Sequence, residues 1–200
     1  MEQLINLVKS LKSSEIKPVI DKRMIEFESI PRDFENLFRE LAFCILTAGT
    51  SAELGIKTVN HLGNTLFSGT EEEIKNKLKE VYRFHTIRAG YLYHARSSFK
   101  KLDINSKNIR ELLVKNIKGI GMKEASHFLR NIGFKDYAII DFHIVDVLIK
   151  NNLIEKPKTL NVKKYLEIET ILRELANELD MSLAELDLYL WYHETGKVLK

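Results

Sequence analysis

Residues 109–130, IRELLVKNIKGIGMKEASHFLR, describe two amphipathic helices joined by a tight turn. On both sides of the Gly-Ile-Gly at 119–121, apolar residues recur at spacings of three and four, which is a helical period. The first helix is predicted to end near Ile117, and the second to run over about 122–131. Glycine adopts the positive φ that a tight turn needs. Ile120, between the two glycines, is predicted to anchor the turn in the core.

This pattern is typical of a helix-hairpin-helix motif, which binds a nucleic-acid backbone without reading bases. Gly119 and Gly121 have no side chains, so the amides that start the second helix are expected to be free to meet a phosphate oxygen, aided by the helix dipole. Gly-x-Gly also occurs in ordinary turns between helices. The basic surroundings of this one favour DNA binding.

The formal net charge of +3 hides a strong asymmetry. Residues 75–135 contain 15 Lys and Arg but only 4 Asp and Glu, so this block carries +11 and the remainder −8. The block surrounds the hairpin, which favours a nucleic-acid footprint over a merely solvated helical face. The acids gather in residues 167–187, where a long helix over 162–179 is expected to turn them outward.

The rest of the chain also has helical periodicity, so we predict an all-α fold with two helical lobes flanking a DNA-binding cleft. Residues 44–137 are predicted to form a central lobe that ends in the hairpin, and residues 1–43 and 138–200 a second lobe. A buried extended segment from Tyr137 is expected to lead into a helix near Asp141. The expected helix starts and stops are Pro31, Ser51, Thr70, Asn105, Ser182, Gly133 and Gly196.

Composition excludes several classes of protein. The longest uninterrupted apolar run, residues 41–46, is far short of the roughly 20 residues that span a bilayer. The start Met-Glu-Gln does not resemble a signal peptide, so we expect an intracellular protein with no membrane partner. A single cysteine, Cys44, excludes an internal disulfide, an all-cysteine zinc site and a self-contained four-cysteine iron–sulfur cluster. We therefore predict chemistry without a metal site.

Two side chains are candidates for catalysis. Lys123 lies in the first turn of the second helix, where the helix dipole disfavours a cation and favours the neutral amine that a nucleophile needs. Asp141 follows 18 positions later. Ten helical residues carry the chain about 15 Å away, and eight extended residues can return it by up to about 26 Å. The alternatives are a surface phosphate contact for Lys123 and an N-cap for Asp141, and capping is compatible with catalysis.

At these residues the chain resembles the helix-hairpin-helix (HhH-GPD) DNA glycosylases. GIGMKEA resembles the hairpin with the lysine of the bifunctional members, and IIDFHI resembles the segment with the catalytic aspartate. The tail DLYLWYHETGKVLK resembles that of the archaeal-type 8-oxoguanine glycosylase/lyases, which implies a lesion pocket containing Trp191 and Lys200. Two features depart from the family pattern: the loop before Asp141 has Gly133 but no Pro, and Gly49 stands where relatives often have an amide side chain.

The resemblance implies a base-excision repair enzyme that flips 8-oxoguanine out of double-stranded DNA, excises it and nicks the strand through a Schiff base on Lys123. Asp141 would stabilise charge on the sugar. Arg88, in a candidate wedge segment over 83–91, and His143 would contact DNA. The resemblance also implies a possible monovalent cation at the hairpin carbonyls, with no other cofactor. We further expect a monomer that associates with the nucleoid.

Two alternatives stay open on the residues alone. One is a glycosylase of the same superfamily that removes a different damaged or mismatched base. The other is a non-catalytic helix-hairpin-helix module that tethers a partner to DNA, for which an acid in a cationic phosphate site has no obvious use.

Overall fold

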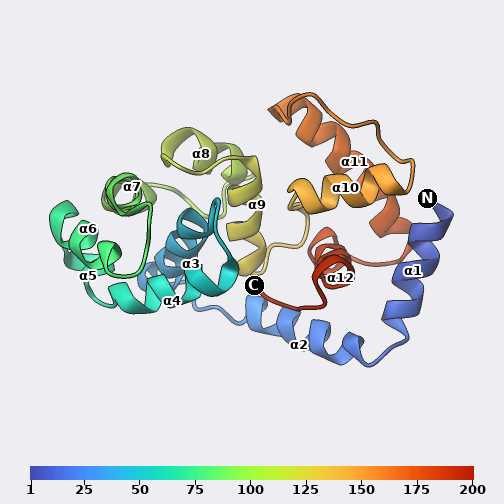
Figure 1. The fold of residues 1–200 in the computed structure, drawn as a ribbon, viewed down its shortest axis with the longest axis horizontal. Coiled ribbons are helices and arrows are strands. Elements are labelled where there is room, and N and C mark those ends of the chain that lie inside the picture. Colours follow the sequence, from blue (N-terminus) through green and yellow to red (C-terminus); the bar gives the residue numbers. More distant parts are fainter. The chain divides into compact units, whose positions relative to one another are not determined.

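The computed structural model describes residues 1–200 and consists of helices and connecting loops, without a strand (Figure 1). The prediction of an all-α fold is therefore confirmed. The helices are α1 (Glu2–Lys12), α2 (Ile16–Glu28), α3 (Phe34–Thr47), α4 (Ala52–Leu62), α5 (Thr65–Ser68), α6 (Glu71–Lys79), α7 (His85–Phe99), α8 (Ile109–Asn116), α9 (Met122–Asn131), α10 (Phe142–Lys150), α11 (Val162–Glu178) and α12 (Leu183–Thr195).

The chain divides into two compact units. Residues 30–128 form one, here called the hairpin unit, and residues 1–29 with 129–200 form the other, here called the split unit. The predicted central lobe, 44–137, differs at both ends. It omits residues 34–43 of α3, a helix that packs against α4 and α7 within the hairpin unit. It also includes the end of α9, where Arg130 forms a buried ion pair with Asp187 of α12 within the split unit.

In the hairpin unit, α3 supplies most of the core. Its Phe38 stacks on Phe34 with ring centroids 5.3 Å apart, and Phe99 of α7 lies 6.3 Å from Phe38. The helix begins at Phe34 because the Asp33 carboxylate accepts the backbone N–H of Asn36 at 3.0 Å, which caps the N-terminus. The expectation that Pro31 lies in the first turn was therefore wrong, since Pro31 precedes the cap.

The other predicted helix starts in this unit had mixed outcomes. Ser51 caps α4, and Thr70 with Glu73 forms the expected reciprocal capping box at α6. Asn105 does not open α8, which begins at Ile109. Asn105 instead donates its N–H to the Asp103 carboxylate at 3.0 Å, so the two residues form a local turn before the helix.

In the split unit, α12 packs against α1, α2, α10 and α11. The expected stops are confirmed: Gly133 follows α9 with φ 89°, and Gly196 ends α12 in the left-handed region. Ser182 caps α12 as predicted. No helix is both long and apolar enough to cross a bilayer.

The prediction that α11 turns all its acids outward was wrong at one position. Glu169 is only 6% exposed, and its carboxylate accepts the backbone N–H of Ala138 at 2.9 Å. The neighbouring Ile168 and Leu172 point into the core, so Glu169 lies at the margin of the buried face. The helix thus uses one acid for an internal hydrogen bond and leaves others, such as Glu167, exposed.

Candidate active site

The hairpin between α8 and α9 has the predicted geometry. Helix α8 ends at Asn116 and α9 begins at Met122, so both predicted boundaries are confirmed. Within the turn, the N–H of Ile120 donates to the carbonyl of Ile117 at 3.3 Å. Ile120 is 6% exposed, which confirms that it anchors the turn. The hairpin is therefore fixed from inside while its glycines stay accessible.

Both the backbone conformation at position 119 and the neighbouring Tyr91 ring require a glycine there. Its φ is 84°, and a Cβ at this position would overlap the ring of Tyr91 on α7. The sequence analysis included Tyr91 in the candidate wedge segment 83–91 but did not predict its contact with the hairpin, which joins residues 28 positions apart. The guanidinium of Arg88 lies 5.5 Å from the centroid of the same ring. Tyr91 therefore packs between the hairpin turn and a candidate DNA-binding arginine.

Arg88 has a structural role in addition to the predicted one. Its Nη2 donates to the carbonyl of Ala48 at 2.8 Å, at the end of α3. Tyr82 donates to the carbonyl of Leu46 at 2.6 Å in the same helix end. These side chains satisfy carbonyls that have no partner within the helix. They hold the loop that contains Gly49, which is exposed and has φ 79°.

One hairpin amide is already occupied. The N–H of Gly121 donates to the Glu124 carboxylate at 3.2 Å, which is half of a capping box. This contact differs from the expectation that all amides at the start of α9 are free. Met122, Lys123 and Glu124, the first residues of α9, have amides with no acceptor within the helix, whose first bond runs from the N–H of Ala125 to the carbonyl of Gly121. These three amides are the ones left to meet an anion.

Lys123 is half-buried in the first turn of α9, next to the buried side chain of Met122. No hydrogen bond or ion pair within the chain engages its Nζ atom. The side chain can therefore extend toward a ligand without first breaking an internal contact. That is the property a lysine nucleophile needs.

Asp141 caps α10 with one of its two carboxylate oxygens. Its Oδ1 accepts the N–H of His143 at 3.0 Å and the N–H of Ile144 at 3.1 Å. The predicted N-cap is therefore confirmed. Neither of these bonds uses Oδ2. A single carboxylate can thus hold the helix start and still present an oxygen to a substrate.

In the segment that leads to Asp141, Ala138, Ile139 and Ile140 are buried, as predicted, and lie in neither a helix nor a strand. Tyr165 of α11 hydrogen-bonds this backbone twice. Its hydroxyl donates to the carbonyl of Ala138 at 2.6 Å and accepts the N–H of Ile140 at 3.1 Å. Sequence reasoning did not identify Tyr165, since nothing in its local pattern distinguishes it from a core aromatic.

Three aromatic rings are in contact, two at the start of α10 and one on α12. Phe142 is 69% exposed, and its ring centroid lies 3.9 Å from that of His143. His143 in turn meets Trp191 of α12 edge-on at 5.1 Å. The structure thus brings together two predicted site residues, His143 and Trp191, within the split unit. Lys200 is half-buried beyond the end of α12.

Two members of the basic block face inward. Arg130 is 3% exposed and pairs with Asp187 at 2.7 Å, and Arg110 is 4% exposed. Both guanidinium groups therefore contribute to packing and contribute little to a surface footprint. Exposed members of the block include Lys79, Arg83, Lys100, Lys101, Lys107, Lys115, Lys118 and Lys135.

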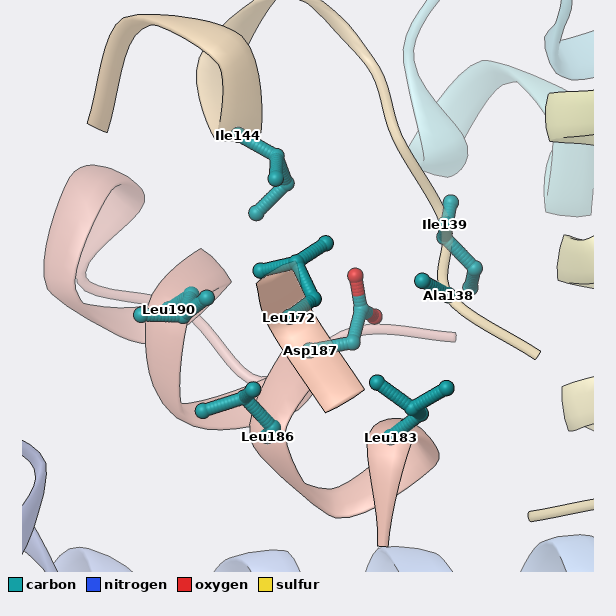
Figure 2. A pocket seen from close by; sticks show the side chains of 8 residues that line it. All are labelled: Ala138, Ile139, Ile144, Leu172, Leu183, Leu186, Asp187 and Leu190. Atoms are coloured by element: carbon teal, nitrogen blue, oxygen red, sulfur yellow. The ribbon is translucent and has the colours of Figure 1, made fainter. Parts of the chain in front are cut away.

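A small cavity lies within the split unit, between the segment before α10 and helices α10, α11 and α12 (Figure 2). Figure 2 shows the Asp187 carboxylate among apolar side chains that include Ile139, Leu172 and Leu183. The space holds about one water molecule, far less than a nucleobase. It is therefore a packing defect beside the Arg130–Asp187 pair. No group of three His, Cys, Asp or Glu side chains is arranged to hold a metal ion.

Comparison with known proteins agrees with the hairpin and the Asp141 segment. A family model described as 8-oxoguanine DNA glycosylase (Ogg-HhH) matches residues 20–181, which include both. The chain belongs to the 8-oxoguanine DNA glycosylase family. This membership confirms the resemblance that the residues indicated.

Relatives match the chain along nearly its whole length. The protein named 8-oxoguanine DNA glycosylase/AP lyase from Methanocaldococcus jannaschii is 51% identical over 98% of this chain and 99% of its own. The protein of the same name from Korarchaeum cryptofilum is 50% identical over 100% and 99%. The crystal structure of the Methanocaldococcus jannaschii glycosylase/lyase in complex with 15mer DNA containing 8-oxoguanine superposes with a TM-score of 0.93, covering 99% of this chain and 100% of that one at 50% identity.

Proposed function

We propose that this protein is a bifunctional enzyme of base-excision repair that excises 8-oxoguanine and nicks the abasic strand. The similarity to 8-oxoguanine DNA glycosylase/AP lyases along nearly the whole chain is the observation that supports it most. Two features of the structure fit that chemistry. Lys123 is half-buried in a helix-hairpin-helix, and the Asp141 carboxylate caps α10 with only one of its two oxygens.

In the first step, the neutral Lys123 amine attacks C1′ of the flipped nucleotide as the glycosidic bond breaks. The bonding electron pair leaves with the base, which takes up a proton. The sugar ring then opens to a Schiff base between C1′ and Nζ. Removal of a proton from C2′ expels the 3′ phosphate, which completes the β-elimination.

Asp141 has two simultaneous tasks in this scheme. Its Oδ1 keeps the start of α10 in place by accepting two backbone N–H groups. Its Oδ2 stabilises the positive charge that develops on the sugar as the base departs. Because the carboxylate is fixed before substrate binds, little reorganisation is needed at the moment of reaction.

The substrate in this proposal is double-stranded DNA with an oxidised guanine. The free amides at the start of α9, beside Gly119 and Gly121, bind a phosphate, and Arg88 and His143 add further contacts. The enzyme works as a monomer, without a membrane partner, inside the cell and close to the nucleoid.

Trp191 and Lys200 form the lesion pocket. Extruding the base from the duplex costs a few kcal/mol. Stacking of the Trp191 ring on the extruded base offsets part of this cost. A main-chain oxygen of Lys200 accepts the N7 proton that 8-oxoguanine has and guanine lacks. Binding guanine would leave this acceptor unpaired, and an unpaired buried polar group discriminates strongly.

The proposed chemistry uses no soluble cofactor, because Lys123 itself supplies the nucleophile. A monovalent cation could bridge the hairpin to a phosphate through the carbonyls of Lys115, Ile117 and Ile120. Lys115 lies in the last turn of α8, where carbonyls lack intrahelical partners, and the Ile117 carbonyl, which accepts the N–H of Ile120, keeps a second lone pair for a cation. Exchanging K⁺ for a bulky organic cation at constant ionic strength would then weaken DNA binding.

Borohydride trapping tests the central step. The wild-type protein is expected to form a covalent complex with an 8-oxoguanine duplex, and Lys123→Gln is expected to abolish it. Lys118→Gln is the matched control, since Lys118 is an exposed lysine of the hairpin turn just before α9. Trapping that survives in Lys123→Gln would remove this residue from its role. Binding without any trapped complex would favour a non-catalytic DNA-binding module.

Incision of a panel of duplexes tests the substrate. Cleavage strongest at 8-oxoguanine supports the proposal, and cleavage strongest at another lesion supports a relative with a different base preference. Deleting Lys200 should lower excision of 8-oxoguanine by about 10-fold or more, with abasic-site nicking retained. Unchanged 8-oxoguanine excision in this deletion would contradict the Lys200 contact.

A further inference from the structure

We infer that Tyr165 and Glu169 of α11 are positioning residues that hold Asp141 in its reactive geometry. The inference rests on the proposed function, in which Asp141 stabilises charge on the sugar. The sequence motifs of the hairpin and of the segment around Asp141 do not predict a role for either side chain. Both lie one turn apart on α11 and bond the backbone of the segment that leads to Asp141.

The contacts are short, and the side chains that make them are buried. The Tyr165 hydroxyl lies 2.6 Å from the carbonyl oxygen of Ala138 and 3.1 Å from the nitrogen of Ile140. A Glu169 oxygen lies 2.9 Å from the nitrogen of Ala138. Tyr165 is 2% exposed and Glu169 6%. The two side chains thus fix both backbone polar groups of Ala138 and the donor of Ile140.

These bonds replace a partner strand. The segment from Ala138 to Ile140 belongs to no helix or sheet, and its side chains are buried. Buried backbone groups need hydrogen-bond partners, and helix or sheet normally supplies them. Here the side chains of α11 supply them. Their number and direction specify one path for the backbone.

That path ends at Asp141. Ile140 is held through its N–H, and the next residue begins the cap of α10 through Oδ1. The backbone is therefore fixed on both sides of the carboxylate, which sets where Oδ2 points. The loop has Gly133 and lacks a proline, so its rigidity must come from contacts. A misplacement of about 1 Å in a reacting group can cost about 100-fold in rate.

Tyr165→Phe tests the inference, because it removes the hydroxyl and keeps the ring in the core. The single-turnover rate of 8-oxoguanine excision, with enzyme in excess, should fall about 10- to 100-fold. DNA affinity should not change. Tyr189→Phe is the matched control: Tyr189 is fully buried in the same unit, and its hydroxyl makes no hydrogen bond. It should keep the wild-type rate.

The Asp141→Asn background separates positioning from general damage. If Tyr165 acts through Asp141, then Tyr165→Phe should have almost no further effect on the excision rate in Asp141→Asn protein. The same fold-loss in both backgrounds would overturn the inference. Failure of the proposed function itself would be visible without any Tyr165 variant, as a wild-type excision rate in Asp141→Asn.

Glu169 provides the second arm if Tyr165→Phe folds poorly. Glu169→Gln keeps an oxygen that can accept the N–H of Ala138, and it should retain most of the rate. Glu169→Leu removes the acceptor and should lose about 10-fold or more. Equal rates for the Gln and Leu variants, after both are shown to be folded by thermal unfolding, would remove Glu169 from the positioning role.

Discussion

The N-termini of α9 and α10 carry the two proposed catalytic residues, and they are built in opposite ways. At α9, the Lys123 Nζ makes no internal hydrogen bond or ion pair, and the turn before it owes its shape to glycines. At α10, the Asp141 carboxylate accepts two backbone N–H groups. The preceding segment is held by side chains from α11. One group is free to move and the other is fixed.

The difference follows from what each group must do. A nucleophile forms a bond, so its amine must travel to C1′ and stay there through the elimination. A carboxylate that stabilises charge helps most when it is oriented before the charge appears. We therefore expect the role of Asp141 in excision to depend on the α11 side chains that hold its segment. We expect the role of Lys123 as nucleophile to be lost only when Lys123 itself is substituted.

Apart from substitution of the nucleophile Lys123 itself, Asp141→Asn should have the largest effect of the changes at these two helix starts. Asparagine caps helices about as well as aspartate, so folding should be nearly unchanged. Loss of the charge should lower the single-turnover excision rate about 100-fold or more. The measurement is excision of 8-oxoguanine with enzyme in excess, alongside thermal unfolding.

Asp33→Asn is the matched control, since Asp33 caps α3 in the same manner. Hydrogen bonds from the backbone N–H and then the side chain of Asn36 lower the pKa of Asp33 below its usual value. Its ionised form therefore stabilises the fold at neutral pH, and this contribution is lost as the pH falls through the lowered pKa. The control should be slightly less stable than wild type at neutral pH, should lose this difference in acid, and should leave excision untouched. A comparable loss of excision in both variants would contradict a special role for Asp141.

Gly119→Ala should have the next largest effect, because it breaks the hairpin itself. The positive φ and the overlap with the Tyr91 ring should together destabilise the protein by about 1–3 kcal/mol. DNA affinity should fall as the turn shifts. Gly49→Ala is the control, because Gly49 has a similar φ with open space around it. Chemical denaturation should show a smaller loss for Gly49→Ala, and equal losses would mean that Tyr91 contributes nothing.

Glu124→Gln should have the smallest effect and the opposite sign. The amide oxygen of glutamine can still accept the N–H of Gly121, so the cap should persist. Removing a negative charge beside the phosphate site should tighten DNA binding up to about 5-fold at low salt. Glu35→Gln changes an exposed first-turn acid of α3 and should not alter affinity. Weaker binding in Glu124→Gln would show that its carboxylate helps the turn more than it repels DNA.

Local rules predicted much of this structure. The hairpin boundaries, the caps at Ser51, Thr70 and Ser182, and the cap by Asp141 each depend on a few neighbouring residues. A short pattern contains all of that information. Where a local rule failed, as at Asn105, a competing local contact with Asp103 formed instead.

The supports of the site could not be predicted, because they join residues far apart in the chain. Glu169 was expected on an outer helix face, and Arg130 within a basic footprint. The partner of Glu169 is 31 positions away, and that of Arg130 is 57. A buried charge with a distant partner looks like any surface charge in a sequence. Both members of the Arg130–Asp187 pair lie in the split unit.

The only cysteine, Cys44, lies fully buried in α3. A thiol in such a place reacts slowly with alkylating or oxidising reagents. The natural chain is therefore a ready background for site-directed chemistry: a cysteine placed at Lys118 or Phe142, both exposed, would be the one fast-reacting thiol. Disulfide cross-linking of each variant to thiol-bearing oligonucleotides would map which nucleotide each helix start approaches, without altering the native cysteine.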